Sequence, residues 1–414
     1  MAIVRGYSSP ARGPVTSDAL GFNGTTSILP REVGSDIFYL DPSSNPFTLL
    51  TDKAGNASTD NPKFEWYEKA LRPKMVNFDT TGTGLDASTT EATLVVAESN
   101  YVQVGDVIQN PANGEIVITV SQTDATTYEV VRAAAGSTAS TGWSAGDDLF
   151  IIGSAYAEGV DVPAPDEWQE VHKFNYTQIF RRSFGASATR EATKSYFGAN
   201  RAKLTGEKAI EHAMDIERAF LFGGRSENAV DADGGTPTTP SAGSGVYRTT
   251  GGFTYWAVEN VLDLNGASLS EPDLEGWLED VFQHTTSGDS RLLLASPPVI
   301  TVLDMLAVDK IRTVNDSNMT YGIAVRQWLT SHGTLNIVKH RLLSDGGPDY
   351  AAGALAVDLK KVKMRTLGGR STSLKKNRQG PGVDGWIDEY LTECGLQFAN
   401  AEVHGKLLAV GAAA

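Results

Sequence analysis

Cysteine is almost absent from this chain of 414 residues. The single Cys394 excludes an internal disulfide framework and any zinc site built from several cysteines. The fold therefore does not depend on an oxidising compartment. Long hydrophobic runs are lacking too, since no stretch approaches the ~18 apolar residues of a membrane span. The first residues also lack a signal-peptide core. We expect a protein made in a cytoplasm, with no membrane partner.

Basic residues are scarce, and the two signs of charge are separated along the chain. The net charge of −15 argues against general nucleic-acid binding, because phosphates attract lysine and arginine. From Asp79 to Asp166 there are 13 acidic residues and one basic residue, Arg132. From Leu359 to Gln379 there are 8 basic residues and no acidic one.

This separation has two interpretations. The acidic and basic stretches are either two solvated surfaces or matching surfaces of neighbouring copies, since opposite patches steer association. The second interpretation makes ten residues candidates for contacts between copies. They are Lys360, Lys361, Lys363, Arg365, Arg370, Lys375, Lys376, Arg378, Asp147 and Asp148.

Motifs for catalysis, cofactors and metals are missing. Residues 142–146 fit the nucleophile elbow G-x-S-x-G, but a strand pattern follows where a helix is required. We therefore interpret Ser144 as part of a turn. The six histidines are scattered, and no H-E-x-x-H, phosphate-binding loop or dinucleotide fingerprint is present. Residues 231–234 resemble the start of a calcium loop without its later ligands. Next to Glu393, Cys394 is an improbable nucleophile. We predict no catalytic, cofactor-binding or metal-binding residue, and no enzyme.

The N-terminal third predicts an arm followed by a long hairpin. Residues 1–62 carry six of the 17 prolines, so we expect an extended arm with only short helical pieces, ordered on another surface. Residues 63–182 predict a hairpin whose strands begin near Phe64 and return between Trp168 and Phe180. Runs of β-branched and aromatic residues between them predict a small β-rich domain at about 80–160.

Residues 183–250 predict a domain dominated by one helix, from Ala186 to Phe222. Its face carries small residues at a heptad-like spacing, and Gly198 and Gly206 leave its continuity open. A coiled-coil dimer is the alternative, but an alanine-rich seam of about three heptads is weak for one. We therefore expect a long helix that lies across a sheet. Residues 223–252 predict a long exposed loop.

The remaining sequence predicts an α/β domain and closing strands. In residues 251–357, Ser270 caps a helix, residues 291–295 form a buried strand, and Ser296 caps a second helix that begins at Pro297. Two further strands are expected at 335–339 and 353–358. Residues 358–414 add closing strands near 362–366, 386–392 and 395–401. The fold class is α+β.

This order of parts resembles the major capsid proteins of tailed bacteriophages with the Hong Kong 97-type fold. The resemblance extends over about residues 60–405 and is sharpest to a subgroup long catalogued as a domain of unknown function. It rests on the order of several strings: 157–159 (AEG), 175–180 (NYTQIF), 215–224 (DIERAFLFGG), 333–341 (GTLNIVKHR), 356–359 (AVDL) and 389–396 (EYLTECGL).

The resemblance implies an N-terminal arm, an E-loop with the β-rich insertion, a peripheral domain with a spine helix, and an axial domain. It implies a structural subunit that self-assembles, as hexamers and pentamers, into an icosahedral head around double-stranded DNA. Scaffolding, portal and decoration proteins are the implied partners, and the DNA is enclosed without specific binding. The short N-terminus implies a separate scaffolding protein. The protein would lie in the virion, after assembly in the bacterial host cytoplasm.

Three other functions stay open at this point. An encapsulin-like cargo shell shares the fold class, and the absence of neighbouring DNA-packaging genes would favour it. A β-rich tail or decoration protein fits the insertion but not the long helix. A serine hydrolase rests on Ser144 alone, and an ester-cleavage assay of Ser144→Ala decides it.

Overall fold

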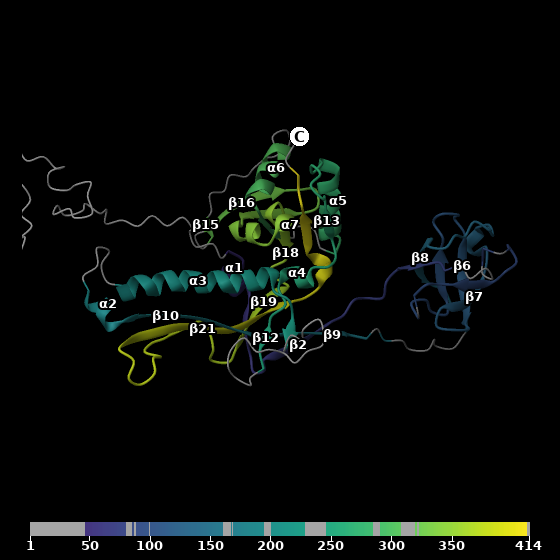
Figure 1. Cartoon of the computed structure of the whole chain (residues 1–414). Coiled ribbons are helices and arrows are strands. Elements are labelled where there is room, and N and C mark those ends of the chain that lie inside the picture. Colours follow the sequence, from purple (N-terminus) through teal and green to yellow (C-terminus); the bar gives the residue numbers. More distant parts are fainter. Residues whose placement is uncertain are drawn as a thin grey trace, which may run out of the picture. The chain divides into compact units, whose positions relative to one another are not determined.

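The computed structural model describes residues 46–79, 85–86, 88–98, 100–159, 167, 169–193, 200–227, 246–284, 290–307, 319–320 and 323–411. The chain divides into two compact units (Figure 1). The main unit comprises Met1–Phe64 and Asn175–Ala414, and the inserted unit comprises Glu65–Phe174. The main unit mixes helices and sheets, whereas the described part of the inserted unit has strands and no α-helix. The architecture is α+β, as expected.

A five-stranded sheet forms one half of the main unit. Its order is β1-β19-β21-β10, with β20 paired to β21. The strands are β1 (Asn56–Thr59), β10 (Gln178–Ser187), β19 (Val362–Leu367), β20 (Ser373–Lys375) and β21 (Gly385–Phe398). Strands β10 and β21 pair antiparallel over ten residues. Helix α3 (Asn200–Phe222) lies along these two strands (Figure 1).

Helix α3 confirms the prediction of a long helix across a sheet. Ile216 and Phe220 are buried in a core shared with Phe180 of β10. The helix is continuous through Gly206, which is exposed, as is Ala202. Along the described part of the stripe, burial therefore increases from the exposed Ala202 and Gly206 to the buried Ile216 and Phe220.

The predicted start of this helix at Ala186 is wrong. Strand β10 continues to Ser187, whose side chain accepts a hydrogen bond from the Arg190 N–H and caps the short helix α2 (Ala188–Ala192). In β10 the exposed and less exposed positions alternate, which is the period of a strand with one buried face. Pairing with β21 therefore outweighs helix propensity here. Ala199 and Gly198 lie outside the described residues.

Helix α1 (Pro46–Ala54) belongs to the expected arm but packs on the main unit. Phe47 is completely buried and contacts Phe253 edge to face at 6.4 Å between ring centroids. The expectation that this segment is ordered only on another surface is wrong for α1 and β1, which pack on the chain's own core and pair with β19. The predicted arm before Pro46 lies outside the described residues.

A buried carboxylate of α3 caps α1 from a distance of about 170 residues. Glu217 accepts hydrogen bonds from the backbone N–H groups of Phe47 at 2.9 Å and Thr48 at 2.7 Å, and from the Thr48 hydroxyl. The other contact is the Nε2 atom of His340, which lies 2.6 Å from Glu217 Oε1. Both side chains are fully buried. One carboxylate therefore joins α1, α3 and the end of strand β17 (Thr334–Lys339).

The other half of the main unit is a seven-stranded mixed sheet with helices packed on it. The order is β13-β22-β18-β14-β17-β16-β15. These strands, apart from β17, are β13 (Val261–Asp263), β14 (Ser290–Ala295), β15 (Met319–Thr320), β16 (Ile323–Leu329), β18 (Ala354–Val357) and β22 (Gly405–Leu408). Helices α5 (Glu271–Phe282) and α6 (Pro297–Ala307) share a core with it. The remaining described α-helices of the main unit are α4 (Phe253–Trp256) and α7 (Pro348–Ala351).

The predicted helix starts in this α/β half are confirmed. The Ser270 hydroxyl accepts a hydrogen bond from the Asp273 N–H, and α6 begins at Pro297. The predicted cap of α6 is wrong in one respect, because the buried Ser296 hydroxyl has no hydrogen-bond partner among the described residues.

Two expectations for loops and turns are corrected. Strand β21 is one long strand where two were expected, because Gly395 is needed for close packing and not for a turn. A Cβ atom there would lie 2.6 Å from the Tyr176 carbonyl oxygen. The expected exposed loop at 223–252 is wrong at its ends: β11 (Ser226–Glu227) pairs with β12 (Arg248–Thr249). Residues 228–245 lie outside the described part.

The inserted unit contains a closed six-stranded barrel, which confirms the predicted β-rich insertion. The order β3-β8-β5-β6-β7-β4 is closed by a bridge between Phe78 and Val96. The strands are β3 (Met75–Asn77), β4 (Thr93–Val95), β5 (Asp106–Gln109), β6 (Ile116–Gln122), β7 (Thr127–Val131) and β8 (Asp148–Ser154). As predicted, flanking strands pair as a ribbon, β2 (Lys63–Glu68) with β9 (Val171–Tyr176).

An ion pair is buried at the barrel. Glu115 is fully buried and accepts hydrogen bonds from Arg132 Nη2 at 2.7 Å, the Trp143 indole N–H at 2.9 Å and the Ser140 N–H at 3.0 Å. Burial alone raises the pKa of Glu115, but these hydrogen bonds outweigh it and lower the pKa to about 2. A charged carboxylate is therefore part of the folded barrel.

We expect acid to destabilise the barrel through Glu115. Because the folded pKa lies below the unfolded value, the contribution is complete above pH 4.5 and is lost as the pH falls towards 2. The difference corresponds to roughly 3 kcal/mol of unfolding free energy. Hydrogen exchange of the barrel strands between pH 5 and pH 3 measures it. Glu115→Gln should be less stable at pH 5 and lack this pH dependence; equal pH slopes in both proteins would contradict the assignment.

Candidate functional site: the basic face of the five-stranded sheet

The five-stranded sheet has one face under α3 and one face that carries positive charge. In β10, β19 and β21, alternate side chains point to opposite faces, and paired residues share a face. Six cations lie on the face away from α3, above two carboxylates of β21, and together they are called the basic face. Its cations are Arg181, Lys363, Arg365, Arg370, Lys375 and Arg378, and its carboxylates are Glu389 and Glu393.

The two carboxylates hold three arginines in place. Glu389 accepts a hydrogen bond from Arg181 Nε at 3.2 Å, and Arg378 Nε lies 3.2 Å from its other oxygen. Glu393 pairs with Arg370. Both glutamates are about 5 % exposed, whereas the three arginine side chains are 42 to 58 % exposed. The two carboxylates are therefore buried against the sheet, whereas the guanidinium groups of the three arginines are exposed at the surface.

The other cations are only partly neutralised. Arg365 donates a hydrogen bond to the Gln397 side chain at 2.7 Å. Lys363 and Lys375 are exposed and have no ion-pair partner among the described residues. With six cations and two carboxylates, the face has a net positive charge in a chain whose net charge is −15. Such a patch attracts acidic partners and steers their approach.

The structure gathers half of the ten predicted contact residues on this face. The basic ones found there are Lys363, Arg365, Arg370, Lys375 and Arg378. Of the others, Lys360 and Lys361 lie in the turn before β19, and Lys376 directly follows β20. Sequence reasoning missed Arg181, Glu389 and Glu393 as parts of the surface. Arg181 reaches Glu389 only because β10 pairs with β21. The two residues are 208 positions apart, so no local sequence pattern predicts their contact.

The two predicted acidic residues belong to the inserted unit and differ in environment. Asp147 accepts hydrogen bonds from the Asn110 side chain at 3.0 Å and from the Ser144 N–H at 2.9 Å. It therefore shapes the turn before β8, which confirms that Ser144 lies in a turn followed by a strand. Asp148 is exposed on β8 opposite Asn77. Of the pair, Asp148 is the one available for contacts.

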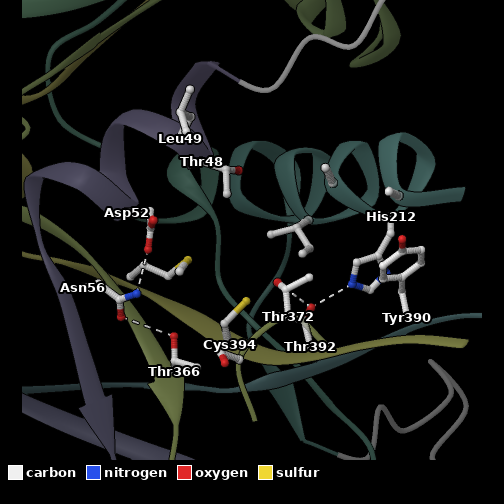
Figure 2. A pocket seen from close by; sticks show the side chains of 15 residues that line it. Thr48, Leu49, Asp52, Asn56, His212, Thr366, Thr372, Tyr390, Thr392 and Cys394 are labelled. Carbon is white, nitrogen blue, oxygen red and sulfur yellow. Dashed lines mark hydrogen bonds between the residues drawn. The ribbon is translucent and has the colours of Figure 1, made fainter. Parts of the chain in front are cut away.

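An open pocket of about 430 Å³ lies on the α3 side of the same sheet, between α1, α3, β19 and β21 (Figure 2). Figure 2 shows His212 of α3 hydrogen-bonded to Thr392 of β21, at 2.8 Å. Burial lowers the pKa of His212. Burial first, and the nearby Glu393 second, raise the pKa of Cys394 to about 12. Cys394 is thus a thiol and a poor nucleophile, and the lining offers hydrogen bonds and apolar contact.

The described part of the chain offers neither a metal centre nor a membrane-spanning helix. No cluster of three or more histidine, cysteine, aspartate or glutamate side chains has the geometry to hold a metal ion there. No helix within the described ranges is both long and apolar enough to cross a membrane.

A known protein family matches almost the whole chain. The family model described as SU10 major capsid protein matches residues 15–411. The chain belongs to the SU10 major capsid protein family. It is 23% identical over 352 residues to the major capsid protein of Pseudomonas phage PaMx41, which covers 82% of this chain and 79% of the relative.

Solved structures similar to this capsid protein are more distant. A chain of Microbacterium phage Oxtober96 has a TM-score of 0.47 at 10% identity, covering 96% of this chain and 100% of that one. A chain of Gordonia phage Cozz has a TM-score of 0.46 at 12% identity, covering 100% and 99%. At these scores no contact or partner is transferred from them. The capsid protein's own element order agrees with the parts expected of a Hong Kong 97-type fold.

Proposed function

We propose that the chain is the structural subunit of a tailed-bacteriophage head, a shell of hexamers and pentamers around double-stranded DNA. The match of the capsid protein family to residues 15–411 carries this proposal. The protein would lie in the virion and act without enzymatic chemistry, through contacts between copies. Self-assembly of the purified protein tests it directly: electron microscopy should reveal uniform closed particles, and only dispersed monomers at high concentration would count against it.

We propose that the basic face of one copy receives the acidic inserted unit of another. In the inserted unit, Arg132 is paired with Glu115 and Arg72 with Asp106, so neither arginine offsets the acidic surface. On the basic face, Lys363 and Lys375 have no ion-pair partner among the described residues. Opposite charges favour and align such a contact, and many weak contacts add up in a closed shell.

Further partners follow from the same function. Scaffolding, portal and decoration proteins are the proposed protein partners, with assembly in the cytoplasm of the bacterial host. The packaged DNA would be enclosed without specific binding. The net charge of −15 supports this, because it keeps phosphates from adhering to the shell.

Charge reversal at Lys375 of the basic face and at its neighbour Lys376 tests the contact. Lys375→Glu with Lys376→Glu should reduce the yield of closed particles at least about tenfold, since a loss of ~1.4 kcal/mol per contact has that effect. The monomer should stay folded because both side chains are exposed. Particle counts by negative-stain microscopy and circular dichroism of the monomer measure the two effects. The control is Lys339→Glu, an exposed lysine of β17; normal shells from the double variant would refute the contact.

An encapsulin-like cargo shell is the second candidate, because it shares the fold class. The capsid family match favours the phage head. Nuclease-protected DNA inside particles from infected cells distinguishes the two. A tail or decoration protein fits less well, since the main unit is built around a long helix and a seven-stranded mixed sheet.

A further inference from the structure

The barrel of the inserted unit carries an apolar strip on its outer surface. Cross-strand partners share a face of a sheet, and two rows of such partners run across the barrel wall. One row joins Met75, Phe150, Gln109 and Ile116, and the other joins Val107, Ile118 and Val131, with Ile152 exposed beside them on β8. Among the residues of these two rows, Gln109 alone has a polar side chain.

The strip is exposed although its side chains are of the kind found in cores. Met75, Phe150, Ile152 and Val131 are 43 to 56 % exposed, whereas their neighbours Leu149 and Ile151 point inward and are at most 1 % exposed. The barrel is therefore already filled, and the strip is not needed for its core. A contiguous apolar patch of this kind on a sheet surface marks an interaction site.

Charge disfavours a second barrel as the partner of the strip. Acidic side chains flank it, since Asp148 precedes Phe150 on β8 and Glu129 precedes Val131 on β7, and both are exposed. Two barrels that met through their strips would bring like charges together, which is unfavourable. The partner should present apolar side chains with cations around them.

The basic face has this composition. Ile179 of β10 is 50 % exposed and Ile387 of β21 is 38 % exposed. Both point away from α3, as Arg181 and Glu389 do. We propose that the apolar strip of one copy docks onto the basic face of a second copy, with Asp148 and Glu129 towards its cations. This rests on the proposed shell function and specifies which side of the inserted unit makes the contact.

Variants of the strip test the docking. Ile152→Thr with Val131→Thr keeps the β-branched shape of both exposed positions but removes apolar surface. We expect the critical concentration for shell formation to rise at least about tenfold, because apolar contact in the interface is lost. Val104→Thr is the matched control: Val104 is 43 % exposed on the same unit but lies in the turn before β5. Unchanged assembly of the double variant would overturn the docking.

Cross-linking gives an independent measurement on the unmodified protein. Shells assembled from equal amounts of unlabelled and ¹⁵N-labelled subunits are treated with a carbodiimide, which joins lysines to nearby carboxylates. We expect mixed-isotope links between Lys363 or Lys375 and Asp148 or Glu129. Links only within one isotope would place the strip on its own chain, and links from the basic face to other acidic segments only would exclude the strip; either overturns the docking.

The results also separate this docking from the shell function. If wild type and the Val104→Thr control both fail to form particles, the shell proposal fails. If both form particles and the strip variant does so equally well, the shell proposal stands and only the docking is lost.

Discussion

Glu217→Gln is expected to lower the free energy of unfolding of the main unit by about 3 to 5 kcal/mol, the usual cost of disrupting a buried, fully engaged charge. Each carboxylate oxygen of Glu217 receives two donors: one from Phe47 N–H and His340 Nε2, the other from the Thr48 N–H and hydroxyl. A glutamine side chain offers one oxygen and one NH2 group. In either orientation of that side chain, one of the two backbone N–H groups would then face the NH2 group and lose its acceptor.

Helix α1 should be the first element to be released in this variant. Its first N–H groups depend on Glu217, so the amides of residues 47 and 48 should lose protection against hydrogen exchange, together with the rest of α1. Glu207→Gln is the control, because Glu207 lies on the same helix, is only partly buried and pairs at 4.0 Å with Lys203. We expect that change to cost less than about 0.5 kcal/mol. Unaltered exchange in α1 would disprove the capping role of Glu217.

Arg132→Met is expected to cost the inserted barrel about 3 to 5 kcal/mol, because Glu115 would keep its charge without its cation. Arg132 also donates to the carbonyl oxygens of Leu85, Ser88 and Ser140, so three separate loop positions lose a common anchor. Barrel strands should exchange amide hydrogens much faster, whereas α3 should not change, since no residue of the main unit takes part in these bonds.

The matched control for this variant is Lys74→Met. Lys74 is exposed next to β3, so its replacement should change barrel stability by less than about 1 kcal/mol. Hydrogen exchange with peptide resolution measures the protection of amides in both units in one experiment. If Arg132→Met left the barrel protected while destabilising the main unit, the ion pair would not be the anchor of the barrel.

Local periodicity predicted much of the fold correctly. Runs such as residues 115–120 and 149–152 are rich in β-branched and aromatic side chains, which favours strands, and they form β6 and β8. Ser270 followed by Pro272 predicted the start of α5. These signals are strong because they depend on neighbouring residues alone.

The errors occurred where a distant partner decides the local structure. Residues 186 and 187 are strand because β21 pairs with them, although the sequence there is compatible with a helix. Helix α1 forms within a proline-rich segment because Glu217 satisfies its first N–H groups. In both cases the deciding group lies more than 150 residues away.

The sequence by itself determined the succession of parts, the separation of acidic and basic stretches and the similarity to phage capsid proteins. Each of these depends only on composition and on the order of neighbouring residues. Only the tertiary structure decided which charges share a surface. Strand pairing brings Arg181 to Glu389. It also leaves Asp148 exposed, whereas Asp147 accepts hydrogen bonds within its turn. The physical reason is that a side chain's face follows from its strand register, and register depends on partners that are remote in the chain.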